Sequence, residues 1–318
     1  MAMQKKNIIY KILEYYYLEN MSQFEIAEKL GITRVAVSRL LSRARRDGLI
    51  EFKIKYPASY VIDRHESLER KLRTKYNLKD CIVVNSYSDY HDTIKELSEH
   101  LSEILSKIVT DNTFIGVGWG TTLETTVHML EIREKHSVRV VPLVGGYGKY
   151  FDDMHSNNIA RLLAGKYGGN SYVTNIPAAF DTKEIKDTIL RDSAAKEIFR
   201  LAKRVEVALL CVSDLSTQST LYRSGQINQE DIYYLSGLGV IGDINYIFID
   251  QDGNYVPNEI SERTTTIFPI ELMQSVKNGV GIAIGERKAQ ILKACLEGRL
   301  INILATDLDA AKKILEVE

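Results

Sequence analysis

The residues best suited to bind an anion lie in Gly116–Thr122, whose sequence is GVGWGTT. An apolar run ends there among glycines, and a helix is predicted to begin at Thr121 and Thr122. The first N–H groups of a helix have no acceptor within it, and the helix dipole makes that end positive. Such a junction can hold a phosphate, and the two hydroxyls can add hydrogen bonds. The stretch lacks the lysine of a Walker loop and does not fit GxGxxG, so an ordinary capped turn remains an alternative.

A second junction, at Val144–Gly146, also ends an apolar run. A glycine such as Gly145 lets a ligand come close to the backbone. His155 and Asn157 follow after a polar loop and are candidate ligand contacts. A lone histidine is more often structural or solvated than functional, so that interpretation is kept beside the ligand role.

Three charged residues could complete a ligand site. Asp243, in the apolar stretch VIGDINYIF, could cap a turn or bind sugar hydroxyls. Arg223 and Lys288 could each neutralise a phosphate. The alternative for both cations is a solvated surface charge.

The second kind of chemistry, DNA binding, is predicted for Ser22–Arg46. Ser22 and Glu25 have the spacing of a capping box for a helix at about Gln23–Leu30, which Gly31 ends. Thr33 is placed to cap a second helix with a polar start and a basic end, as expected of a major-groove reader. A helical hairpin with a solvated basic face is the alternative. The candidate DNA contacts are Ser22, Gln23, Thr33, Arg34, Val35, Ser38, Arg39, Arg43, Arg45 and Arg46.

Those contacts are expected to differ in kind. Ser and Thr can bond base edges or phosphates, and arginine can grip guanine with two bonds. Arg43, Arg45 and Arg46 are expected to meet phosphates, which give affinity without sequence information.

The faces of the two helices that point into the core are predicted from helical periodicity. They comprise Phe24, Ile26, Ala27 and Leu30 in the first helix, and Val37, Leu40, Leu41 and Ala44 in the second.

Length and charge indicate two domains. The chain has 318 residues, and residues 1–60 hold eleven Lys and Arg against six Asp and Glu, although the net charge is only −1. A support helix over 4–18, the two helices and a short strand IEFKI make a predicted helix-turn-helix domain at 1–56. Pro57 marks the boundary to a second domain at 57–318.

The second domain is predicted to be an α/β, doubly wound, mostly parallel sheet. CIVVN, FIGVG, VRVVPLV, VALLCVS, VGIAIG and INILATD are apolar runs separated by helical segments. Strands without polar alternation are buried on both faces, and ligands bind at their carboxyl ends.

No apolar run approaches the roughly 20 residues needed to cross a bilayer. The isolated Cys81, Cys211 and Cys295 favour buried thiols in the cytoplasm, and we expect neither a metal nor a cofactor.

The order of helix-turn-helix, GVGWGTT, PLVGG, GDI and GIAIGERKAQILKACLEGRLINILATD resembles the SorC family of bacterial sugar-responsive transcription regulators. The resemblance covers essentially the whole chain. It implies an effector domain similar to sugar-phosphate isomerases, which binds a sugar or sugar phosphate, and homo-oligomers, commonly tetramers, on palindromic operators. It also implies that Trp119, Gly120, Thr121 and Thr122 form a phosphate loop. His155, Asp243, Lys288 and Arg223 would meet the effector.

One position departs from that family. Some relatives carry Lys or Arg immediately before the paired glycines of the second junction, where this chain has Val144. This argues against a bisphosphate effector and leaves a monophosphate or a free sugar.

From the motifs and the resemblance together, we predict a non-enzymatic, DNA-binding regulator of carbohydrate use that forms a dimer or tetramer. The alternatives are a sugar-phosphate isomerase or deaminase with a DNA-binding head, and a constitutive DNA-binding scaffold with a vestigial pocket.

Overall fold

A computed structural model of the protein describes residues 2–50, 65–146 and 155–316. The chain divides into one unit at 1–63 and another at 64–318. Most of the predicted strand IEFKI, and the predicted boundary at Pro57, lie outside the described residues.

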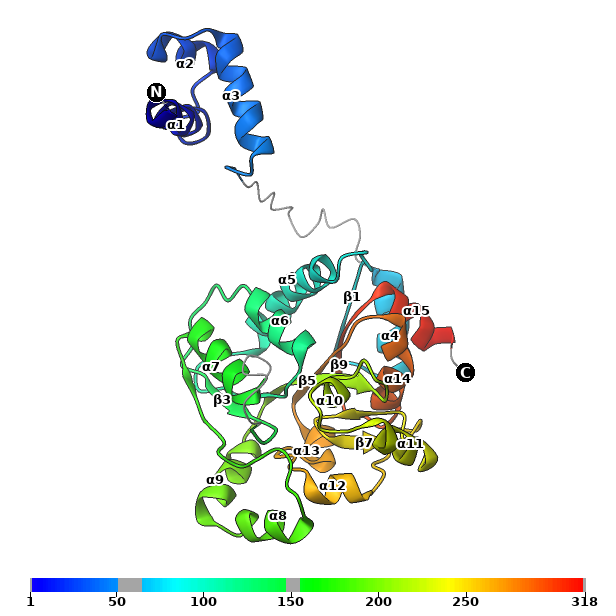
Figure 1. The fold of residues 1–318 in the computed structure, drawn as a ribbon. Helices are drawn as coiled ribbons and strands as arrows, with labels where there is room; N and C mark the ends of the chain where they lie inside the picture. The colour runs from blue at the N-terminus through cyan, green and yellow to red at the C-terminus, as the bar shows by residue number, and fades with distance from the viewer. Residues whose placement is uncertain (1, 51–64, 147–154, 317–318) are drawn as a thin grey trace. The chain divides into compact units, whose positions relative to one another are not determined.

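The first unit is helical (Figure 1) and comprises α1 (Ala2–Leu13), a π-helical turn η1 (Glu14–Leu18), α2 (Gln23–Leu30) and α3 (Arg34–Arg46). Ser22 and Glu25 form the predicted capping box at the start of α2. Gly31 takes the left-handed conformation, with φ of 63°, and the Thr33 hydroxyl accepts the Ala36 N–H. The helix-turn-helix prediction is confirmed.

The core of this unit contains most of the predicted apolar positions. Ile26, Val37 and Leu41 are buried, and Ile12 of α1 packs with them. Phe24, predicted to face inward, is 61% exposed. With 3.6 residues per turn, position 24 lies roughly 115° around the helix from the centre of the stripe made by residues 26, 27 and 30. The prediction for Phe24 is wrong because it followed residue type rather than angle.

The second unit alternates strands and helices. Its main strands are β1 (Asp80–Val84), β2 (Phe114–Val117), β3 (Arg139–Pro142), β4 (Asn170–Ser171), β5 (Val207–Asp214), β8 (Asn278–Ile282) and β9 (Ile303–Asp307). The longer helices are α4 (Glu66–Tyr76), α5 (Tyr90–Ile108), α6 (Thr121–Met129), α7 (Ser156–Tyr167), α9 (Ser193–Ala202), α14 (Ala289–Glu297) and α15 (Leu308–Glu316). The other helices, of nine residues or fewer, are α8 (Lys183–Leu190), α10 (Thr220–Arg223), α11 (Gln229–Gly237), α12 (Glu259–Arg263), α13 (Ile270–Ser275) and the 3₁₀ turn η3 (Glu286–Lys288).

These strands form the predicted parallel sheet, in the order β1-β9-β8-β5-β2-β3-β4. One face packs against α5, α6 and α7 through a core that includes Leu97, Val127 and Ile159. The other face packs against α4, α9, α13, α14 and α15 through residues such as Leu72, Ile198 and Leu292. Figure 1 shows α5, α6 and α7 on the opposite side of the sheet from α4, α14 and α15. Burial on both faces explains the unalternated apolar strands.

A hairpin absent from our sequence prediction extends the end of β5. Strands β6 (Gly242–Ile244) and β7 (Ile247–Ile249) pair antiparallel, and β6 also pairs with β5. The two turn residues, Asn245 and Tyr246, have φ of 52° and 64°. This two-residue turn is hard to predict because such turns usually contain glycine and Tyr246 does not fit that pattern.

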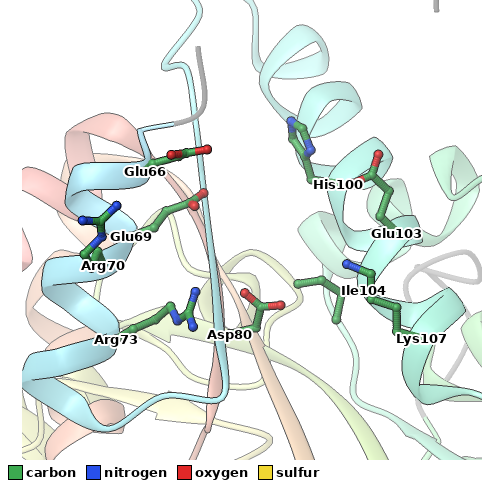
Figure 2. Close-up of a pocket in the computed structure, with 9 residues that line it drawn as sticks. All are labelled: Glu66, Glu69, Arg70, Arg73, Asp80, His100, Glu103, Ile104 and Lys107. Atoms are coloured by element: carbon green, nitrogen blue, oxygen red, sulfur yellow. The ribbon is translucent and has the colours of Figure 1, made fainter. Parts of the chain in front are cut away.

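Helix α4 covers the open side of the edge strand β1, across a charged cleft from α5 (Figure 2). Figure 2 shows Glu66, Glu69, Arg70 and Arg73 on α4, facing α5 residues that include His100. Buried Glu69 accepts the Val83 N–H at 3.0 Å. The carboxylate therefore satisfies a backbone donor that an edge strand would otherwise leave open to another chain.

Glu69→Ala should lower the free energy of unfolding by about 1–3 kcal/mol, because a buried N–H loses its acceptor. Denaturant unfolding of the full chain measures the change. Glu66→Ala, an exposed glutamate on the same helix, is the matched control. Equal stability of the two variants would show that Glu69 does not stabilise β1.

Candidate functional site

A cavity of about 850 Å³ lies at the carboxyl ends of the parallel strands. Its lining comes from the last residues of β5 and β9 and from the segments that follow β1, β2, β5, β8 and β9. Four predicted residues line it: Thr121, Thr122, Arg223 and Lys288. The sheet therefore gathers residues more than 160 positions apart in the chain, as the parallel-strand rule predicts.

The strand order explains why the cavity lies here. From β2 the chain continues outward through β3 and β4, then returns to place β5 on the other side of β2. At such a reversal the connections leave neighbouring strands in opposite directions and open a crevice between them. Thr121 and Thr122 line it from the β2 side, and Ser213 lines it from the β5 side.

Helix α6 points its N-terminus into this crevice. Gly120 precedes it with φ of 118°, a conformation that favours glycine. The Tyr90 hydroxyl donates to Thr122 Oγ1 at 2.9 Å. The first N–H groups of α6 have no acceptor within the helix, so they can bind an anion together with the threonine hydroxyls.

Cations also line the cavity. Arg223 and Arg287 are exposed lining residues, whereas the Lys288 side chain is only 16% exposed. Lys288 Nζ forms an ion pair with Asp214 Oδ1 and lies 3.4 Å from Ser213 Oγ. Burial acts to raise the pKa of Asp214, but Lys288, Ser216 and Arg287 together outweigh it and hold that pKa below its ordinary value.

Buried Asp307 ties together three segments at the cavity. Its Oδ2 accepts the Ser86 hydroxyl at 2.9 Å, and its Oδ1 accepts the Gly285 N–H at 2.9 Å. Ser86 Oγ in turn accepts the Asp309 N–H at 3.0 Å. These bonds fix the start of η3, the turn that ends at Lys288.

Asp243 lies behind the cavity. It is 4% exposed, and its Oδ2 accepts the Tyr246 N–H at 3.1 Å, so it caps the β6–β7 turn. It pairs with Ser213 across the antiparallel ladder. Burial raises its pKa from 3.8 to about 7, against the opposing effects of the Tyr246 N–H and Lys288. Of the two roles inferred from sequence, the turn cap is observed.

The other predicted ligand residues do not line the cavity in the described part of the chain. Trp119 is buried and stacks on Tyr246, with ring centroids 5.3 Å apart. Asn157 uses its amide to donate to the Thr174 carbonyl and to accept the Thr174 N–H. His155 is buried at the start of α7.

Position 145 requires glycine for a different reason from the one we expected. A Cβ atom there would lie 2.5 Å from the Pro177 carbonyl oxygen. The close approach observed here is by the chain's own backbone, and a ligand contact at this glycine stays a prediction.

Several cavity residues were missed by the sequence analysis. Ser86, Tyr90, Gln218 and Arg287 line the site, and Asp214 pairs with its lysine. Ser86 follows the strand CIVVN directly, so the strand-end rule could have found it. Gln218 lies in a loop without a motif, and only the fold brings it to the cavity.

The predicted DNA-binding face is exposed on α3. Thr33, Arg34, Val35, Arg39 and Arg43 are exposed, as are Arg45 and Arg46. Arg45 Nε donates to the Tyr17 hydroxyl at 3.0 Å, and Arg43 pairs with Asp47 at 3.1 Å. These neighbours orient two arginines at the end of the helix.

Comparison with known proteins gives this arrangement a family. A family described as "Putative sugar-binding domain" matches residues 61–316, and a Crp-like helix-turn-helix domain matches residues 16–71. The chain belongs to the SorC-type regulators with a sugar-binding domain. This regulator is 29% identical to the sorbitol operon regulator of Klebsiella pneumoniae, over 97% of this chain and 98% of that protein. It is 28% identical to the deoxyribonucleoside regulator of Bacillus subtilis, over 99% of each.

A solved structure also agrees with the fold. The regulator matches the crystal structure of the full-length sorbitol operon regulator SorC from Klebsiella pneumoniae with a TM-score of 0.79 and 28% identity. The match covers 97% of this chain and 98% of that one.

Within the described residues, no helix is long and apolar enough to cross a membrane. The same residues contain no cluster of three or more His, Cys, Asp or Glu side chains that could hold a metal ion.

The raised pKa of Asp243 predicts a pH dependence of stability. A carboxyl whose folded pKa exceeds its unfolded value stabilises the protein fully below the unfolded pKa, and that contribution is lost as pH rises through the folded value. Asp243→Asn keeps an acceptor for the Tyr246 N–H but cannot ionise. Its melting temperature relative to the unsubstituted protein should therefore rise between about pH 4 and about pH 7, and the difference should be level above that range. A constant difference across that range would show that Asp243 is ionised throughout.

Proposed function

We propose that this regulator senses a sugar monophosphate, or a free sugar, in the cavity at the carboxyl ends of its strands. The observation that carries the proposal is the convergence of the α6 N-terminus with Lys288 and Arg223 on one cavity. A phosphate would accept N–H groups from Thr121 and Thr122, and the cations would neutralise it. The neutral Val144 immediately before the paired glycines favours one phosphate over two.

The remaining predicted residues have indirect roles in this proposal. Trp119 and Asp243 support the cavity from behind, through the Tyr246 stack and the hairpin turn. Gly120 sets the direction of α6. His155 and Asn157 are proposed to hold the α7 end of the sheet, where Ser156 donates to the Val144 carbonyl at 2.8 Å.

The α3 face is proposed to read operator DNA in the major groove. Arg39, Ser38 and Val35 would meet base edges, and Arg43, Arg45 and Arg46 would meet phosphates. The two helices would be held on the DNA phosphate backbone by Ser22, Gln23, Thr33 and Arg34. Effector binding can change operator affinity only if the effector prefers one of two states of the protein.

We propose further that the regulator acts in the cytoplasm as a homodimer or homotetramer and catalyses no reaction. Catalysis on a sugar phosphate would require an acid and a base beside the substrate. Asp243 and His155, the pair suggested by the sequence, are both buried, and neither is among the described residues that line the cavity.

Arg39→Ala should weaken binding to the preferred operator by about 1–3 kcal/mol, because a base contact is lost. Operator fragments can be selected from random DNA with the full-length protein, and binding measured by fluorescence anisotropy. Arg46→Ala is the comparison and should weaken binding to all sequences alike, lowering the salt slope by about one. Unchanged affinity and sequence preference for Arg39→Ala would contradict the proposed reading face.

Lys288→Ala should reduce affinity for a phosphorylated effector by about tenfold or more, because a charge-assisted bond is lost. The parent sugar should be affected much less. Calorimetry with paired sugars and sugar phosphates measures both, and Lys312→Ala, an exposed lysine of α15, controls for charge. Equal losses for phosphorylated and free sugar would exclude a phosphate at Lys288.

A further inference from the structure

The Lys288 ammonium, which the proposed function assigns to the effector, is already paired in this structure. We infer that Asp214 is a built-in competitor for Lys288, and that an anionic effector binds by exchange with this carboxylate. Asp214 thereby sets both affinity and selectivity at the site. The inference rests on the proposed function, because it assumes that the cavity receives an anion.

The geometry places the two side chains in competition. Lys288 lines the cavity and has 16% of its side chain exposed, while Asp214 has 15% exposed and lies at the end of β5. An ion pair with so little solvent around it is screened less than one on the surface. A ligand that takes the ammonium must therefore replace a partner as well as displace water.

A second cation makes the exchange possible. Arg287 Nη1 lies 3.9 Å from Asp214 Oδ2, the oxygen that Lys288 does not use, and its side chain is 52% exposed. When Lys288 turns to a ligand, Arg287 remains beside the carboxylate. Without that arginine, the exchange would leave a poorly solvated charge unpaired, which is strongly unfavourable.

The competition also selects among ligands. A carboxylate ligand carries the same single charge as Asp214 and gains little by replacing it. A phosphate ester carries about −1.5 to −2 charges at neutral pH and offers three acceptor oxygens. The pair should therefore favour phosphate esters over sugar acids.

The test uses the full-length protein at constant ionic strength, with inorganic phosphate and acetate as probes. Melting temperature is recorded against probe concentration, which yields the affinity for the folded state. Asp214→Asn should bind phosphate on the order of tenfold more tightly, because the competing charge is gone. It should also bind acetate more tightly, so that the preference for phosphate narrows. Asp252→Asn removes an exposed carboxylate outside the cavity and controls for net charge.

The outcomes separate this inference from the proposed function. Phosphate affinity that is unchanged or weaker in Asp214→Asn, while Lys288→Ala abolishes binding, would overturn the competitor and leave the anion site standing. If phosphate stabilises neither the unsubstituted protein nor Asp214→Asn, the anion site itself fails. Binding by Asp214→Asn alone would support the inference. Melting temperatures measured without phosphate or acetate show whether any variant has lost stability.

Arg287 is tested by a double-mutant cycle. Arg287→Ala should weaken phosphate binding when Asp214 is present and have little effect in the Asp214→Asn background. An equal loss in both backgrounds would mean that Arg287 contacts the phosphate directly, and would overturn its role as the remaining partner of Asp214.

Discussion

The alignment of the parallel strands is the constraint on which the site depends. Apart from the two-residue edge strand β4, the parallel strands are buried on both faces, so neither face offers room for a ligand. The carboxyl ends remain the place where loops can diverge. The reversal between β2 and β5 opens those loops into a cavity. The threonines of α6 and the lysine of η3 are useful only because the sheet holds them at the same edge.

Within that edge, a balance of charge matters more than any single cation. Lys288 is held by Asp214, and Asp214 is shared with Arg287, so the cavity is partly neutralised from within. Asp243 lies one strand behind, and the field of Lys288 opposes the effect of burial on its pKa. A ligand that changed the position of Lys288 would therefore change the electrostatic environment of two carboxyl groups on adjacent strands, those of Asp214 and Asp243.

The part of the fold that joins β5 to β8 was the least predictable from sequence. Strands β6 and β7 are three residues long, and α10, α12 and α13 are four to six residues long. Such short elements give too few positions for a hydrophobic period to emerge. Between Lys183 and Arg204 the chain forms two helices, because Asp192 caps α9 by accepting the Ala194 N–H.

The sequence by itself determined the helix-turn-helix, the alternation of strands and helices, and the junction at GVGWGTT, because caps, glycines and periodic apolar residues act over a few neighbouring positions. Only the tertiary structure decided which charges share a cavity. Asp214, Arg287 and Gln218 carry no local signal of a site, and Trp119 and Asn157 are engaged by Tyr246 and Thr174. The physical reason is that ion pairing and burial depend on distances in space, which the order of strands in the sheet fixes and the order of residues in the chain does not.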